Sequence, residues 1–318
     1  MQAAETISTQ SLGPGDPGYQ TIPVADELGV SARSSQFGLI GMIFSVLVVF
    51  AAAFAYRDLR LDMVEAMIPR NVEFWAVFVL FYLHGPLLDW VIFRHLWNIP
   101  FLSGLGALVR KLVSNELVLG YLGEAQFYAW ARARARFTAA PFGAIKDVAI
   151  LSALTGNAAT VIMLGLSWSL VASGRFGVPM HSVFVSLGVV LLISCVILVF
   201  RKKLFSLNRR ELWLITALHF LRITVFIALS ALLWHLVLPE VSVGLWMVLG
   251  TLRMLVSRLP LLPNKDLVFT GMAVFLLGHD LEIAALMMMF AAITLGAHIV
   301  AAVISGLAGV VETRRSAG

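Results

Sequence analysis

Residues 212–238 read LWLITALHFLRITVFIALSALLWHLVL, a continuous apolar run that contains one full charge, Arg222. A helix needs about 20 consecutive apolar residues to cross the hydrocarbon core of a bilayer. The run does not alternate between polar and apolar residues, as the strands of a membrane barrel do. It therefore predicts a transmembrane helix.

Comparable runs recur along the chain and predict an all-α membrane protein, a polytopic bundle of about eight transmembrane helices. The other predicted spans cover residues 37–56, 72–93, 148–173, 181–200, 241–257, 267–278 and 283–310. The transmembrane domain is accordingly predicted at 37–310. Residues 1–36 lack hydrophobic periodicity and predict a disordered cytoplasmic tail, and residues 311–318 a short cytoplasmic tail.

The composition excludes a soluble globular protein. Hydrophobic residues make up 60% of the 318 residues and charged residues 13%, with a mean hydropathy of +0.91, whereas soluble domains are about 25% charged. One cysteine leaves no disulfide framework and no cysteine-based metal site. We found no metalloprotease, hydrolase or nucleotide-loop motif, so we expect no metal, no cofactor and a function that is not enzymatic. The net charge of +5 is too modest to favour nucleic acid.

Residues 94–146 differ from the other segments because basic and aromatic residues interrupt shorter apolar pieces. From Leu105 onward an apolar stripe follows the helical period, and Glu116 lies within it. This pattern is typical of an interfacial or re-entrant helix. Basic residues also gather at 201–211, 258–266 and the C-terminal tail. With these loops inside, we expect a multi-pass protein of the bacterial inner membrane with both termini in the cytoplasm.

Arg222 is the clearest candidate functional residue, because a charge at membrane depth is costly. His219 lies one turn before it on the same helical face. A guanidinium group facing an internal cavity suits a phosphate. Alternatively, Arg222 is structural and pairs with a carboxylate such as Glu116 or Asp89. If Asp89 is not this partner, we expect it to be solvated, because it lies near the cytosolic end of its predicted span.

A second candidate is the turn RLPLLPNKD at 258–266. Its prolines end one helix, and Asn264 can cap the next, which brings a positive helix terminus beside Arg258 and Lys265. The turn is either an anion site or a basic loop at anionic lipid headgroups. Glu116 is the third candidate, because a carboxylate in an apolar stripe needs a partner or a water-filled cavity.

Two motifs resemble the flippase-like integral membrane family related to the transmembrane region of lysylphosphatidylglycerol synthetases. Residues 115–122, NELVLGYL, are similar to its Gly-Glu-rich motif, and residues 260–267, PLLPNKDL, to its late Pro-x-x-Pro turn. The glycines of that turn are replaced here by Asn264, Lys265 and Asp266. The resemblance implies a bundle of about eight spans that translocates an anionic or aminoacylated lipid, or assists a protein that does.

Three hypotheses remain open at this point. In the first, Arg222, Lys265 and the helix start near Asn264 hold a lipid phosphate, and Glu116 neutralises them when the site is empty. The second is a membrane scaffold that docks a protein partner or anionic lipids through a basic loop, which contains Arg132, Arg134 and Arg136. In the third, an intramembrane transferase uses Glu116 or His219 as its base.

Overall fold

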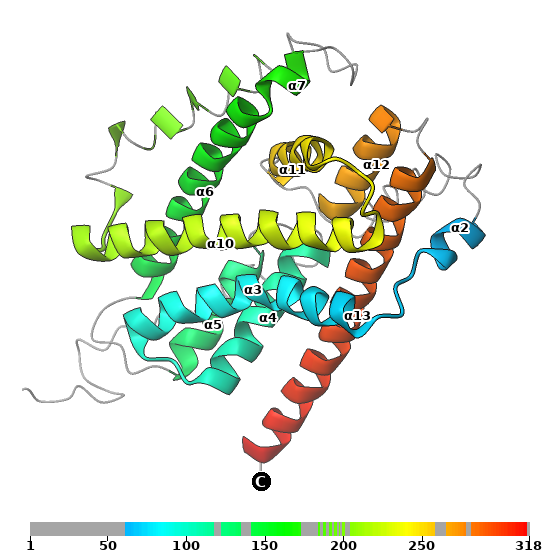
Figure 1. Ribbon diagram of the computed structural model, residues 1–318. Helices are drawn as coiled ribbons and strands as arrows, with labels where there is room; N and C mark the ends of the chain where they lie inside the picture. Colours follow the sequence, from blue (N-terminus) through cyan, green and yellow to red (C-terminus); the bar gives the residue numbers. More distant parts are fainter. Residues whose placement is uncertain are drawn as a thin grey trace, which may run out of the picture. The chain divides into compact units, whose positions relative to one another are not determined.

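The computed structural model describes residues 61–117, 122–134, 141–172, 204–257, 265–277 and 281–316, together with separate positions between 184 and 200. Every regular element within these ranges is a helix (Figure 1). The described helices are α2 (Leu61–Ala66), α3 (Val72–Trp97), α4 (Phe101–Leu117), α5 (Leu122–Arg134), α6 (Pro141–Leu166), α7 (Trp168–Ala172), α10 (Arg209–Val237), α11 (Val243–Ser257), α12 (Lys265–Leu277) and α13 (Leu281–Ser316).

The predicted all-α membrane bundle is confirmed. Four helices are long and apolar enough to cross a bilayer: α3, α6, α10 and the part of α13 from Glu282 to Ile304. The predicted spans 241–257 and 267–278 correspond to the shorter α11 and α12. The predicted span 37–56 and the N-terminal tail lie outside the described residues, and 181–200 is described only at separate positions.

The segment predicted to be interfacial or re-entrant forms α4 and α5. These helices contain 17 and 13 residues, so they are about 25 Å and 20 Å long at 1.5 Å per residue. Both are shorter than the hydrocarbon core of about 30 Å. Neither belongs to the four candidate spans in the described part of the chain.

Helix boundaries follow local capping chemistry. The backbone N–H of Glu211 donates to the Asn208 side chain at 2.9 Å, so α10 begins at Arg209, three residues earlier than predicted. Helix α6 starts at Pro141, a residue whose fixed φ suits the first helical position. Helix α3 ends at Asn98, which adopts a left-handed φ of 51°. Helix α13 continues to Ser316, so most of the predicted C-terminal tail is helical.

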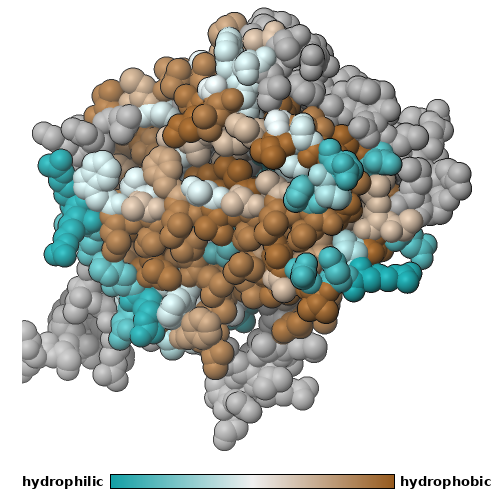
Figure 2. Space-filling model, in the orientation of Figure 1, coloured by the Kyte–Doolittle hydropathy of each residue, from teal (hydrophilic) through white to brown (hydrophobic). Residues whose placement is uncertain are grey.

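Helix α10 lies between α3 and α6 and packs along both (Figure 1). Helix α4 packs against α3, α5 and α13, while α11 contacts α6, α10 and α12. Side chains of α3, α4, α6 and α10 therefore meet in the interior. Figure 2 shows a broad hydrophobic belt across one face of the molecule, with hydrophilic residues at its margins.

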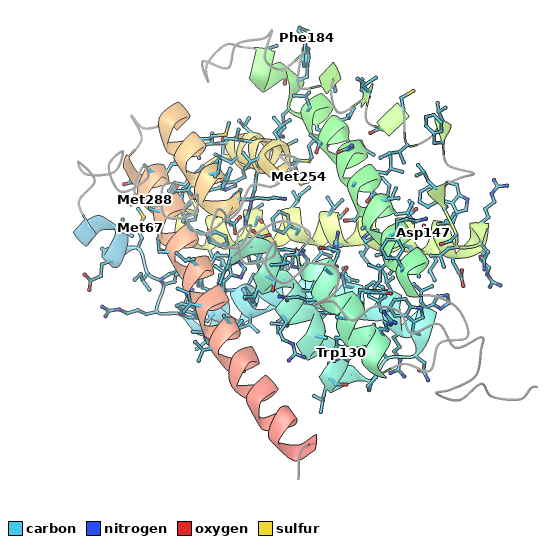
Figure 3. All side chains as sticks on the ribbon, turned by 180° about the vertical axis from the view of Figure 1, so that it is seen from behind. Met67, Trp130, Asp147, Phe184, Met254 and Met288 are labelled. Carbon is cyan, nitrogen blue, oxygen red and sulfur yellow. The ribbon has the colours of Figure 1, made fainter. Side chains whose placement is uncertain are left out.

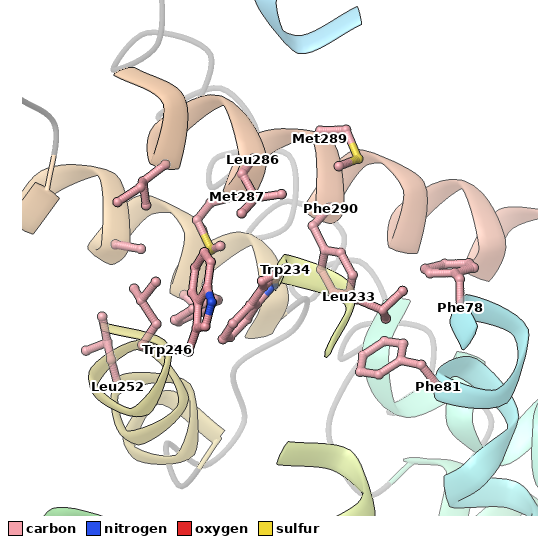
Figure 4. Packing of buried hydrophobic residues seen from close by; sticks show 14 of the residues in the cluster. Phe78, Phe81, Leu233, Trp234, Trp246, Leu252, Leu286, Met287, Met289 and Phe290 are labelled. Carbon is pink, nitrogen blue, oxygen red and sulfur yellow. The ribbon is translucent and has the colours of Figure 1, made fainter. Parts of the chain in front are cut away.

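Aromatic residues dominate the largest core cluster (Figure 4). Trp234 of α10 packs against Trp246 of α11, with ring centroids 5.6 Å apart. Phe290 of α13 meets Phe81 of α3 edge-on at 5.3 Å. Such pairs add about 0.5–1.5 kcal/mol beyond the burial of their surface. They fix α3, α10, α11 and α13 relative to one another around the charged groups described below.

Asp147 fixes the start of α10 against α6 (Figure 3). Its side chain is fully buried, and one carboxylate oxygen accepts hydrogen bonds from the Ser206 N–H at 2.6 Å, the Ser206 hydroxyl at 2.9 Å and the Leu207 N–H at 2.7 Å. Hydrogen bonds to a charged acceptor are stronger than neutral ones. They hold the beginning of α10, and with it the register of Arg222 against α6.

Candidate functional site

Arg222 and Lys111 converge on one carboxylate, that of Asp89. Arg222 donates to Asp89 Oδ1 at 2.7 Å and to the Ser152 hydroxyl at 2.6 Å. Lys111 Nζ donates to Asp89 Oδ2 at 2.8 Å and lies 3.5 Å from Glu124. We call these five residues the Asp89 cluster. They come from α3, α4, α5, α6 and α10, so the cluster connects five helices.

Two members of the Asp89 cluster, Arg222 and Ser152, lie near the middle of α10 and α6. Arg222 follows Arg209, the first residue of α10, by about 20 Å along a helix about 43 Å long. The Asp89 side chain is 8% exposed and the Lys111 side chain 13%. Because long side chains cannot reach water easily from this depth, the charges have to neutralise one another.

The structure shows which carboxylate Arg222 contacts and corrects one expectation. Arg222 pairs with Asp89, one of the two carboxylates considered, and not with Glu116. The prediction that Asp89 is solvated is wrong. Helices α4 and α10 both pack on α3, and they cover the Asp89 side chain near the end of α3.

His219 is fully buried beside this cluster but makes no direct hydrogen bond to it. Its Nε2 lies 3.1 Å from the backbone oxygen of Val148 on α6. Arg222, Asp89 and Lys111 all act on the ring electrostatically. Its Nδ1 has no hydrogen-bond partner among the described residues. His219 thus fastens α10 to α6 one turn before Arg222.

The turn between α4 and α5 depends on the close approach of Gly123 to α4. The Gly123 N–H donates to Asn115 Oδ1 at 2.7 Å, and Asn115 donates to Glu124 at 3.1 Å. A Cβ atom on Gly123 would lie 2.2 Å from the backbone oxygen of Lys111. Only glycine allows this contact, so Gly123 sets the distance between Lys111 and Glu124.

Replacing Gly123 with alanine is expected to destabilise the folded protein by about 1–3 kcal/mol, because backbone atoms have to move apart. Gly106 on α4, the helix that Gly123 contacts, is the matched control, because a Cβ there meets nothing within 4 Å. Gly106→Ala is expected to be neutral or stabilising, since alanine favours helix. Thermal unfolding in detergent compares the two variants, and equal melting temperatures would contradict this account of the turn.

A second charged group surrounds Arg253 of α11, which is 5% exposed. Arg253 donates to Asp266 Oδ1 through Nε at 3.1 Å and through a terminal nitrogen at 2.5 Å, and to the Ser230 hydroxyl at 3.1 Å. Its guanidinium carbon lies 4.5–5.7 Å from the ring centroids of Phe81, Phe226, Phe269 and Phe290. Cation–π attraction is strongest for such desolvated groups.

Glu116 belongs to this second group, which we call the Arg253 cluster: Glu116, Ser230, Arg253, Lys265 and Asp266. The backbone of Lys265 hydrogen-bonds to Glu116, and the charges of Asp266, Lys265 and Arg253 act on it. Glu116 and Lys265, which were expected in one site, are therefore neighbours. The expectation that Glu116 neutralises Arg222 in that site is wrong, because Arg222 pairs with Asp89, whereas Glu116 lies with Lys265, Arg253 and Asp266. Arg258 and Asn264 lie outside the described residues.

Glu116 lies on α4, outside the four candidate spans. Burial, and after it the negative charge of Asp266, raise the pKa of Glu116 to about 7 from 4.5. A carboxyl group with a raised pKa stabilises the fold while it is protonated, and this contribution is lost as the pH rises from about 4.5 through 7. We expect the melting temperature to fall from pH 5 to pH 8, and to fall less in Glu116→Gln. If the melting temperatures of the native chain and Glu116→Gln changed in parallel with pH, the account of Glu116 would be contradicted.

Sequence reasoning missed Arg253 and Lys111. Arg253 lies near the end of a predicted span, where an arginine can usually reach the interface, and Lys111 is one of the basic residues that interrupt the segment 94–146. The signal that could have identified Arg253 is that it is the one charged residue in the apolar run 241–257. Arg132 is exposed on α5, while the side chains of Arg134 and Arg136 lie outside the described residues.

The described residues hold no group of three His, Cys, Asp or Glu side chains that could bind a metal ion. Among the described residues, two groups each combine two cations and two carboxyl groups: Arg222 and Lys111 with Asp89 and Glu124, and Arg253 and Lys265 with Asp266 and Glu116. No family model, no curated protein and no solved structure matches the chain.

Proposed function

We propose that this membrane protein translocates lipids with an anionic phosphate headgroup. The observation that supports the proposal is the convergence of Lys111 and of Arg222, which lies near the middle of the candidate span α10, on the single carboxylate of Asp89. A phosphodiester carries one negative charge, as Asp89 does. It can therefore compete with Asp89 for the two cations.

The donors around Asp89 suit a phosphate. The planar guanidinium of Arg222 can form two parallel hydrogen bonds to phosphate oxygens. Lys111 supplies a second positive charge, and the Ser152 hydroxyl, 2.6 Å from Arg222, is a neutral hydrogen-bonding group. When the lipid leaves, Asp89 pairs with both cations again. This exchange keeps both cations paired with and without the lipid, and an unpaired buried charge would cost several kcal/mol.

A purely structural role explains the cluster less well. A buried ion pair contributes little net stability, because desolvation offsets the attraction between the charges. An apolar contact would join α3 and α10 equally well. Ionisable residues within membrane helices commonly mark transport pathways. The resemblance to the flippase-like family supports the same function, and we place the protein in the bacterial inner membrane with both termini in the cytoplasm.

The test is lipid movement in vesicles reconstituted with the purified protein. A fluorescent phosphatidylglycerol and a matched phosphatidylcholine are added separately, and dithionite bleaches the outer leaflet. Phosphatidylglycerol is expected to cross faster than phosphatidylcholine and faster than in protein-free vesicles. If folded protein moves neither lipid, the proposal fails. That outcome would favour the membrane scaffold, in which exposed basic residues such as Arg132 dock a partner.

A further inference from the structure

A cleft between α6 and α10 lies apart from both charged clusters. Its volume is about 950 Å³, at the upper end of the range of about 300–1,000 Å³ for ligand sites. Apolar side chains dominate its walls, among them Leu154, Val161 and Phe220. Leu191 and Ser194, from the segment between α7 and α10, line it as well. No residue of the Asp89 cluster or of the Arg253 cluster lines it.

The cleft opens to the surroundings of the bundle. Two of its lining residues, Ile162 and Trp213, are 54% and 65% exposed. Both lie on candidate spans, where the surrounding solvent is lipid hydrocarbon. An apolar cleft with an apolar opening suits an acyl chain.

The length of the cleft matches one leaflet. It extends from Leu151 to Ile162 on α6 and from Arg209 to Phe220 on α10, about 16 Å along each helix. This is about half of the 30 Å hydrocarbon core. Asp147, near the start of α6, accepts hydrogen bonds from Ser206, which precedes α10 by three residues, so the beginnings of the two helices lie close together. Arg209 therefore lies at the end where both helices begin.

The positive charge of Arg209 determines which lipid headgroup suits the cleft. Arg209 lies at the cleft's mouth and is exposed at the first position of α10. Because α10 is about 43 Å long, its first residues can extend beyond the hydrocarbon core into the headgroup region. A basic residue at that level attracts anionic headgroups. The only other polar groups lining the described cleft are uncharged: Thr155, Asn157, Ser194 and Thr216.

We infer that the cleft between α6 and α10 binds one anionic phospholipid, with an acyl chain along the two helices and its phosphate at Arg209. The inference rests on the proposed function only for the identity of the lipid. The cleft shares its walls with the helices that hold the Asp89 cluster, since Leu151 lines it next to Ser152. It can hold a lipid before the headgroup reaches Arg222.

The test uses phosphatidylglycerol with a diazirine in its acyl chain, incorporated into vesicles with the full chain. Peptide mass spectrometry maps the crosslinks. Crosslinks are expected on α6 at 158–162 and on α10 at 213–220, and a matched phosphatidylcholine is expected to give about fivefold fewer. Arg209→Glu is expected to remove this preference, while Arg210→Glu retains it. Arg210 is the matched control because it is adjacent, exposed and basic but does not line the cleft.

Several results would overturn the inference. Equal crosslinking of phosphatidylglycerol and phosphatidylcholine would show that the crosslinked lipid is ordinary annular lipid. Equal loss of the preference for phosphatidylglycerol in Arg209→Glu and Arg210→Glu would show that the preference comes from general surface charge. Arg222→Leu separates this inference from the proposed function, because it is expected to stop translocation and leave the cleft crosslinks intact. If the native chain transports lipid but gives no crosslinks in the cleft, the inference about the cleft fails and the proposed function stands. Crosslinks without transport in the native chain overturn the proposed function alone.

Discussion

Replacing Arg222 with leucine is expected to reduce phosphatidylglycerol translocation by about ten- to hundredfold, because hydrogen bonds to charged groups contribute about 1.5–3 kcal/mol each. The fold is expected to survive this change. Asp89 retains its ion pair with Lys111 at 2.8 Å, so no buried carboxylate is left unpaired. The measurements are dithionite bleaching in vesicles and thermal unfolding in detergent.

A charge exchange distinguishes a functional cation from a structural ion pair. Asp89→Arg combined with Arg222→Asp places opposite charges on the same two helices. If the pair serves only to join α3 and α10, the double variant recovers both stability and transport. The proposal predicts partial recovery of stability, because Lys111 then faces a cation at position 89, and no recovery of transport, because the cation no longer lies beside Ser152 on α6. Full recovery of transport would contradict the proposed phosphate site.

The second large effect is expected at Arg253. Arg253→Met removes the cation that Asp266 binds through two hydrogen bonds and leaves that carboxylate near Glu116 without its main partner. Breaking a buried ion pair by removing one partner costs about 3–5 kcal/mol. Methionine is close to arginine in length and packs well against aromatic rings, so most of the loss comes from charge. Denaturant unfolding in detergent measures it.

The matched control removes both charges. Arg253→Met with Asp266→Asn is expected to recover most of the lost stability, because neither charge is left unpaired. A double-mutant cycle with the single Asp266→Asn variant gives the coupling energy between the two residues. Additive effects of the two substitutions would show that the ion pair does not hold α11 and α12 together.

The helical membrane bundle could be predicted because its signal lies in composition and run length. Each long apolar run needs internally satisfied backbone hydrogen bonds in lipid, and a helix supplies them. The helix ends were predicted less accurately than the helices themselves. Asn208 and Pro141 start α10 and α6 earlier than hydropathy indicates, because capping depends on single residues. The short helices α4 and α5 were recognised as an unusual segment, but their arrangement was not.

The individual candidate residues could be predicted better than their partners. The depth of Arg222 in an apolar run and the position of Glu116 in an apolar stripe are local features of the sequence. Their pairing depends on how distant helices pack. Asp89 lies 133 residues from Arg222 in the chain, and only the packing of α3 between α4 and α10 brings them together. Arg253 was missed because its position near a helix end resembles that of an interfacial arginine.

The central claim is that a lipid phosphate takes the place of Asp89 between Arg222 and Lys111. Native mass spectrometry tests it most directly, with the Arg209→Glu chain as the background so that the cleft between α6 and α10 no longer selects an anionic lipid. An anionic phospholipid is expected to remain bound, to be retained more strongly after Asp89→Asn, which removes its competitor, and to be lost after Arg222→Leu. Retention that none of these substitutions changes, or no retained anionic lipid, would contradict the claim.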